Sequence, residues 1–145
     1  MAIVMASSSG LGLGSAMVLA REGVNVVING RDLERLESAL ESIREVATGE
    51  VRYFQGDIKD SRTAAGIVKF TIEEFGKLDH LVTNSGPPPC LHFEEAEDVD
   101  WYESYELLVM SVVRMIREAE PYLRESENGT IVTITSRIVK EPTST

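Results

Sequence analysis

The sequence has little that would suit it to nucleic acids, membranes or an oxidising compartment. Its 145 residues carry 24 acidic against 14 basic side chains, and the net charge of -10 repels phosphate backbones and anionic lipid head groups. The single cysteine, Cys90, allows no intramolecular disulfide, and no apolar run approaches membrane-spanning length. Since the chain also opens without the basic and apolar regions of a secretion signal, we expect a cytoplasmic protein.

Metal ligands are scarce as well. The two histidines, His80 and His92, have no second ligand at a useful spacing, so no metal site is expected. Hydrophobic residues make up 43% of the chain and charged residues 26%, which is ordinary globular composition. The length is enough for one hydrophobic core, and residues 1–145 are therefore predicted to form a single domain.

Short apolar runs alternate with helical periodicity along the whole chain. The predicted strands cover residues 2–6, 24–28, 51–54, 78–83 and 131–135. The predicted helices carry apolar stripes from Leu13 to Ala20, from Leu33 to Ile43 behind Asp32, from Ala64 to Phe75 behind Asp60 or Ser61, and from Tyr105 to Ile116. Such strict alternation predicts an α/β fold, a Rossmann-type doubly wound parallel sheet with right-handed crossovers.

The strongest chemical feature is a small-residue turn between the first strand and the first helix. It reads Ala6-Ser7-Ser8-Ser9-Gly10-Leu11-Gly12-Leu13-Gly14. Glycines there let the backbone approach a pyrophosphate, while helix N-terminal amides and serine hydroxyls donate hydrogen bonds. Small residues would also let a helix pack tightly on a sheet without any ligand, but the position favours phosphate. The predicted cofactor-binding residues of this turn are Ser7, Ser8, Ser9, Gly10, Leu11 and Gly12.

The second predicted strand ends at Asn29-Gly30-Arg31, where a dinucleotide fold approaches the adenosine ribose. An acidic residue there would bind the 2'-hydroxyl and repel a 2'-phosphate, but none is present. Arg31 can instead pair with that phosphate, so NADP is favoured over NAD. The other interpretation is that Arg31 is a solvated residue at a helix start.

In this order the motifs resemble those of the short-chain dehydrogenase/reductase family over the whole chain. The family's Thr-Gly-x-x-x-Gly-x-Gly turn corresponds to residues 5–12, with Ala6 in place of the first glycine. Asp57-Ile58 matches the acidic and apolar pair that flanks the adenine ring, and Asn84-Ser85-Gly86 resembles the Asn-Ala-Gly motif after the fourth strand. The resemblance therefore adds these five residues to the cofactor site.

The resemblance also implies a catalytic serine. Residues 129–136 resemble the strand that delivers it, which places Ser136 in that role. In the family the serine hydroxyl binds the substrate carbonyl, a tyrosine exchanges the proton, and a lysine lowers that tyrosine's pKa and holds the nicotinamide ribose. None of the four tyrosines here is followed by lysine at the Tyr-x-x-x-Lys spacing. We expect that motif beyond Ser136, outside these residues, so the fold is expected to be incomplete at its C-terminal part.

Two further departures concern the substrate side. Alignment on Trp101 and Pro121 puts Leu108 in place of an asparagine that normally supports a water relay, so either the proton path differs or the usual chemistry is not used. The run Pro87-Pro88-Pro89 is also unusual. It resembles a branch described as 3-oxoacyl-acyl-carrier-protein-reductase-like, a description that says little about substrate.

The resemblance implies an NADP-dependent oxidoreductase that acts on a small-molecule carbonyl or alcohol and forms a homo-oligomer through its long helix. Two alternatives stay open. The missing Tyr-x-x-x-Lys pair and Leu108 favour a nucleotide-binding protein without redox activity. A scaffold that keeps the fold and binds no nucleotide is the third possibility. Substrate and reaction direction are not predicted.

Overall fold

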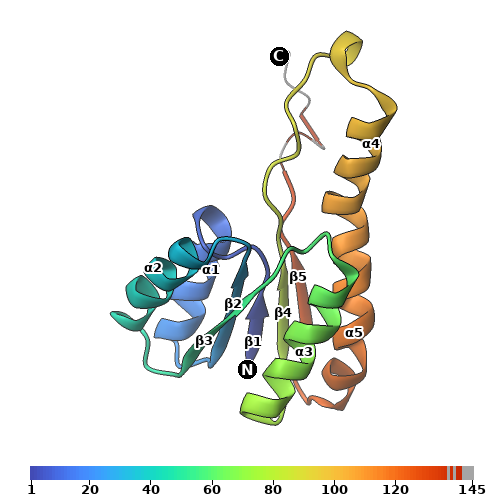
Figure 1. The fold of residues 1–145 in the computed structure, drawn as a ribbon. Helices are drawn as coiled ribbons and strands as arrows, with labels where there is room; N and C mark the ends of the chain where they lie inside the picture. Colours follow the sequence, from blue (N-terminus) through green and yellow to red (C-terminus); the bar gives the residue numbers. More distant parts are fainter. Residues whose placement is uncertain (137, 139, 142–145) are drawn as a thin grey trace.

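Five parallel strands form one sheet with helices packed on both faces (Figure 1). The computed structural model describes residues 1–136, 138, 140 and 141. The strands are β1 Ala2–Val4, β2 Val26–Gly30, β3 Val51–Gln55, β4 His80–Thr83 and β5 Thr130–Thr133. The helices are α1 Gly10–Arg21, α2 Leu33–Arg44, α3 Ser61–Phe75, α4 Asp98–Tyr105 and α5 Ser111–Glu125, with a 3-10 turn at Phe93–Glu95. The strand order β3-β2-β1-β4-β5 confirms the predicted doubly wound architecture.

Side chains of the central strands alternate between two cores. Val4, Val26 and Ile28 pack with α1 and α2 in what we call the first core. Ile3 and Val27 pack with α3 and α5 in the second core. Every residue of β1 is completely buried, because this strand pairs with β2 on one side and β4 on the other.

Strand β5 is one of the two edge strands of the sheet among the described residues, the other being β3. It pairs with β4 alone, and all four of its residues are exposed. Apolar side chains are part of that exposed surface, since Ile131 and Val132 are 41% and 51% accessible.

Capping explains where the middle helices begin and end. The Asp32 carboxylate accepts a hydrogen bond from the Arg35 amide at the start of α2, and the Asp60 carboxylate accepts one from the Arg62 amide at the start of α3. Gly76 ends α3 in the left-handed conformation that glycine tolerates. The cap predicted at Asp32 is therefore confirmed, and of the two candidates for α3, Asp60 and Ser61, the cap is Asp60.

The predicted long helix is interrupted by a π-helical turn over Glu106–Met110, between α4 and α5. The Ser111 amide donates to the Glu106 carbonyl, and the Ser111 hydroxyl donates to the Leu107 carbonyl at 2.6 Å. In a regular α-helix the Leu107 carbonyl would accept from the Ser111 amide. The Ser111 hydroxyl replaces that donor, because the amide is displaced to the Glu106 carbonyl. The extra residue per turn also shifts which side chains face inward. Those that α5 buries are Ser111, Met115, Ala119 and Leu123, whereas Leu108 stays 41% exposed.

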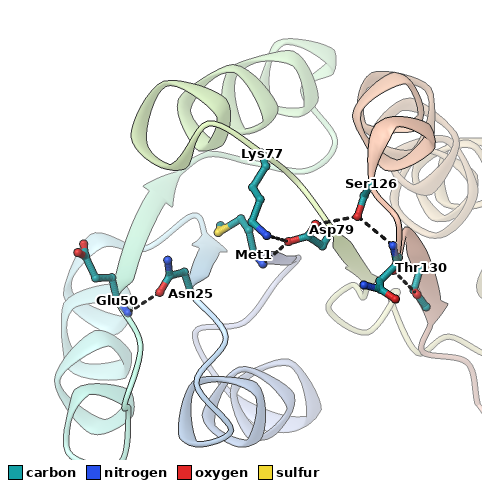
Figure 2. Close-up of polar contacts among 8 residues, drawn as sticks. Met1, Asn25, Glu50, Lys77, Asp79, Ser126 and Thr130 are labelled. Carbon is teal, nitrogen blue, oxygen red and sulfur yellow. Dashed lines mark hydrogen bonds and ion pairs between the residues drawn. The ribbon is translucent and has the colours of Figure 1, made fainter.

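The amino ends of the strands are tied together by charges (Figure 2). The Asp79 carboxylate lies 2.7 Å from the Met1 ammonium and 2.9 Å from the Lys77 ammonium, and it accepts a 2.7 Å hydrogen bond from the Ser126 hydroxyl. Burial opposes ionisation of this carboxylate, but the bonds from Met1, Ser126 and Lys77 outweigh it and hold the pKa of Asp79 well below its ordinary value. The same edge carries a bond from the Glu50 amide to the Asn25 side chain.

No helix among the described residues has both the length and the apolar character needed to cross a bilayer.

Candidate functional site

A cleft of about 480 Å³ opens at the carboxyl ends of β1, β2 and β3. The predicted site residues that line it are Ser8, Ser9, Arg31, Asp57, Ile58 and Gly86. Residues that the sequence analysis did not assign line it too, namely Ala6, Asn29, Gly30, Arg35, Gly56, Lys59, Pro87, Pro88, Pro89, Glu103 and Leu107. Parallel strands place their carboxyl ends at one edge, and ligands of doubly wound sheets bind at that edge.

Helix α1 begins at this cleft without a side-chain cap. Its N-cap residue, Ser9, is extended and makes no capping hydrogen bond, in contrast to the aspartates that cap α2 and α3. Gly10 opens the helix with φ +58°, which brings the chain sharply into its first turn. The first amides of α1 therefore keep their donor capacity and the positive end of the helix dipole for an anion.

Gly12 is needed for close packing under the turn. A Cβ at this position would lie 2.6 Å from the Ala6 carbonyl oxygen, 2.8 Å from Asn84 Nδ2 and 2.9 Å from Ser7 Cα. Backbone on two sides leaves no room for a methyl group. Gly12 thus lets α1 approach the end of β1, while Leu11 beside it is 70% exposed.

Ser7 supports the turn from below. It is completely buried, its hydroxyl donates to the Val4 carbonyl at 2.7 Å, and it accepts from the Asn29 amide at 2.9 Å. Both roles of the hydroxyl are directed into the fold, so Ser8 and Ser9 are the serines of this turn that line the cleft.

Ala6 occupies a backbone conformation that favours glycine. Its φ is +45°, and it is the one non-glycine residue with positive φ in the described part of the chain. Its amide donates to Asn29 Oδ1 at 3.4 Å and its carbonyl accepts from Asn84 Nδ2 at 3.1 Å. Two asparagine side chains, Asn29 in β2 and Asn84 just after β4, therefore hold Ala6 at the position where the short-chain dehydrogenase/reductase motif has glycine.

Charged side chains surround the mouth of the cleft. Three cations line it, Arg31, Arg35 and Lys59. The Arg31 guanidinium lies 3.7 Å from the Asp57 carboxylate, with 71% of its side chain exposed. Such a long, solvated pair is weak, and a phosphate group entering the cleft can replace it. The cleft thus offers cations locally although the chain is acidic overall.

A second cavity of about 660 Å³ adjoins the cleft and shares Gly86, Pro87 and Pro88 with it. Three more predicted residues line it, Asn84, Ser85 and Ser136, whereas Ser7, Gly10, Leu11 and Gly12 line neither cavity. Leu108, Val112, Ile134 and Ile138 give it largely apolar walls. The Ser136 hydroxyl accepts a hydrogen bond from the Ile138 amide at 3.3 Å, and its own proton can still be donated.

The π-helical turn contributes one lining residue to each of the two cavities. Leu107 lines the cleft and Leu108, the next residue, lines the second cavity. Arg114 fixes this turn by pairing with Glu106 at 2.6 Å and donating to the Lys59 carbonyl at 3.2 Å. The helix is thereby attached to the loop that follows β3.

Some of these residues carried signals that the sequence analysis did not use. Asn29 is an amide within an apolar strand, and Arg35 lies four residues after Arg31. Lys59 and Glu103, which pair at 3.6 Å, had no such signal, because they are 44 residues apart and meet only in the fold. The described residues contain no cluster of three or more side chains suited to a metal.

Comparison with known proteins identifies the family. The short chain dehydrogenase family model matches residues 1–145, which is the whole chain. The chain belongs to this family. It is 31% identical over 144 residues to the NADPH-dependent reductase BacG of Bacillus subtilis, and the match covers 97% of this chain and 55% of BacG.

Two solved structures of family members are also similar. L-sorbose reductase from Gluconobacter frateurii, complexed with NADPH and L-sorbose, is 32% identical with a TM-score of 0.92, over 98% of this chain and 54% of that chain. An NADPH-bound short chain oxidoreductase of Pseudomonas aeruginosa PAO1, described as containing an atypical catalytic center, is 27% identical with a TM-score of 0.91, over 98% and 56%. The chain thus spans about half the length of these relatives.

Proposed function

We propose that the whole protein is an NADP-dependent oxidoreductase that reduces a ketone or oxidises an alcohol. The observation that carries this proposal is the uncapped start of α1 opening onto the same cleft as Arg31 and Asp57. One ligand with a pyrophosphate, an adenine and a 2'-phosphate has complementary partners there. The cofactor residues proposed at the turn are Ser7, Ser8, Ser9, Gly10, Leu11 and Gly12, with Ser7 acting through the shape of the turn.

The preference for NADP rests on charge. Arg31, just before the N-cap of α2, and Arg35, in the first turn of that helix, both lie on the rim of the cleft, and no carboxylate occupies the end of β2. Asp57 lies on the adenine side and engages Arg31 loosely. A 2'-phosphate gains charge-assisted hydrogen bonds from guanidinium groups, whereas the 2'-hydroxyl of NAD gains little from them. BacG and the two solved relatives, which are described with NADPH, support this preference.

The nicotinamide end is proposed to reach the second cavity past Asn84, Ser85 and Gly86. The bound cofactor would supply or accept a hydride there. Ser136 would hold the substrate carbonyl oxygen with its hydroxyl, and the apolar walls beside it would exclude water from that contact. The proton of the reaction needs a further donor, because residues 1–145 contain no Tyr-x-x-x-Lys pair.

The substrate is proposed to be a small carbonyl compound or alcohol, of the 3-oxoacyl type by the resemblance of the Pro87 to Pro89 segment. Exposed apolar residues on the long helix, including Tyr105, Val109 and Val113, support assembly into a homo-oligomer. The competing function is nucleotide binding without redox chemistry, which Leu108 in the second cavity favours.

Three measurements on the purified protein test the proposal. Intact mass shows whether the polypeptide exceeds 16.0 kDa and so has room for the tyrosine and lysine. Calorimetric titration should show tighter binding of NADPH than of NADH. Oxidation of NADPH with a panel of ketones should then reveal turnover. Binding without turnover of any ketone or alcohol would support the competing function, and absence of binding would reject both.

A further inference from the structure

Asn29, at the carboxyl end of β2, uses every polar group it has. It is 1% exposed, its amide donates to the Ser7 hydroxyl at 2.9 Å, and its carbonyl accepts from the Ser7 amide at 2.8 Å. Its side-chain oxygen accepts from the Ala6 amide at 3.4 Å. Its side-chain nitrogen donates to the carbonyls of Phe54 and Gly56, each at 3.1 Å.

These partners belong to the two sides of the cleft. Ala6 and Ser7 begin the turn from β1 into α1, where the pyrophosphate is proposed to bind. Phe54 and Gly56 lie directly before Asp57, on the proposed adenine side. One side chain therefore joins three neighbouring strand ends, with β2 in the middle.

We propose that Asn29 is a positioning residue for the cofactor: it holds the β1–α1 turn and the Gly56–Asp57 segment at a fixed separation, so that one dinucleotide can contact both. This inference rests on the proposed function. Only a primary amide brings one acceptor and two donors to this point. An apolar residue would suit the neighbouring core equally well, yet it would leave one amide and two carbonyls without their partner.

Asn29 also stabilises the strained backbone of Ala6, since its side-chain oxygen accepts the Ala6 amide. A residue with a Cβ disfavours φ of +45°, so without its hydrogen bonds to the asparagines the turn relaxes toward negative φ. Such relaxation moves the amides that follow Ala6, which are those that face a pyrophosphate. Loss of Asn29 should therefore affect a ligand that spans both sides more than a ligand that uses one side.

The experiment compares Asn29→Ala with a matched control, Asn25→Ala. Asn25 precedes the same strand at the opposite edge of the sheet, and its side chain accepts from the Glu50 amide before β3 (Figure 2). Dissociation constants for NADPH and for adenosine 2'-monophosphate, which lacks the pyrophosphate, are measured by calorimetry on the full-length protein, at a temperature where circular dichroism shows each variant folded.

Asn29→Ala should weaken NADPH binding at least tenfold and binding of adenosine 2'-monophosphate no more than threefold. Asn25→Ala should change both by less than twofold. Equal losses for the two ligands, or equal losses in the two variants, would overturn the positioning role while leaving the proposed function intact. A wild-type protein that binds neither ligand would overturn both.

Two further variants extend the test, and the first keeps it decisive if Asn29→Ala does not fold. Asn29→Asp preserves shape and acceptor but removes both donors, and it should show the same split between the ligands. In the double variant Ala6→Gly/Asn29→Ala, which lacks the acceptor for the Ala6 amide, glycine adopts the left-handed turn without strain, so at least a threefold recovery of NADPH affinity relative to Asn29→Ala is expected. No recovery would show that Asn29 does not act through Ala6.

Discussion

The amino ends and the carboxyl ends of the strands, called here the amino edge and the carboxyl edge of the sheet, use polar residues in opposite ways. At the amino edge, Asp79 is engaged by two ammonium groups and a hydroxyl at 2.7 to 2.9 Å, which leaves it little capacity for a ligand. At the carboxyl edge, α1 begins without a side-chain cap and Arg31 makes only a 3.7 Å pair. The amino edge therefore closes the fold, whereas the carboxyl edge keeps its donors available. Substitutions at each edge should separate stability from binding.

The largest effect is expected from Gly12→Ala at the carboxyl edge. The new methyl group would meet the Ala6 oxygen at 2.6 Å, so α1 must move away from β1. We expect the free energy of unfolding to fall by about 3 kcal/mol, measured by urea denaturation, and NADPH binding to be lost.

The matched control is Gly14→Ala on the same helix, where an added Cβ meets nothing within 4 Å. It should raise the free energy of unfolding by about 0.5 to 1 kcal/mol through helix propensity. Similar destabilisation by both substitutions would show that the contact with Ala6 is not the cause.

At the amino edge, Asp79→Asn should destabilise the protein by about 2 kcal/mol at pH 7, because the buried Met1 ammonium loses its counter-ion. Since the folded-state pKa of Asp79 is depressed, its stabilisation is complete above the unfolded pKa near 4 and is lost as pH falls below that value. The wild type should thus lose stability more steeply than the variant between about pH 5 and pH 2.

Urea denaturation at several pH values measures this difference, and NADPH affinity at pH 7 should stay within twofold of wild type. Parallel pH profiles for the two proteins would contradict the assignment. A large loss of affinity would contradict the separation of the two edges.

Arg31→Ala tests the binding side alone. The side chain is exposed and weakly paired, so stability should be unchanged. NADPH affinity should fall about tenfold, or about 1.4 kcal/mol, with NADH affinity within twofold. Arg21→Ala, an exposed arginine at the far end of α1, is the control and should alter neither. Equal losses for NADPH and NADH would refute a 2'-phosphate contact.

The smallest effect is a gain in stability. Ala6→Gly removes a methyl group from a residue at φ +45°, and the relief of strain exceeds the added entropy of the unfolded chain. The free energy of unfolding should rise by about 0.5 to 1 kcal/mol. Thermal unfolding of the two proteins provides the measurement, and a lower melting temperature for the variant would mean that Ala6 is not strained.

The sequence predicted the fold because alternation and caps are local properties. Asp32 and Asp60 act within a few residues of their own positions, so their capping roles follow from spacing. The π-helical turn was not predicted. It depends on the hydrogen bond from the Ser111 hydroxyl to the Leu107 carbonyl, and this bond does not alter the spacing of apolar residues in the sequence. A residue inserted into a turn changes the inward face of everything after it.

The candidate site also has residues that could be predicted from the sequence and residues that could not. Arg31 follows β2 directly, Ser8 and Ser9 lie in the turn that follows β1, and the cleft lies where the carboxyl ends of parallel strands meet. Asn29 went unassigned because its partners lie on two other strands, and a polar residue in an apolar run reveals a partner only once the register is known. Ser7 belongs to the turn in sequence, but its side chain faces the interior. A serine hydroxyl can bond to a backbone carbonyl as readily as it can bond to a phosphate, and the sequence does not distinguish the two.

The strand order has a consequence for the time course of folding. The first core draws almost entirely on β1, α1, β2, α2 and β3, all of which precede residue 56. The second core needs α5, and β1 meets its other neighbour, β4, only at residue 80. At a synthesis rate of roughly 5 to 20 residues per second, the side of β1 that carries Ile3 waits on the order of ten seconds for its partners. During synthesis the nascent chain therefore exposes the apolar side chains of the second core, Ile3 and Val27 among them, and this is the surface that a chaperone would bind.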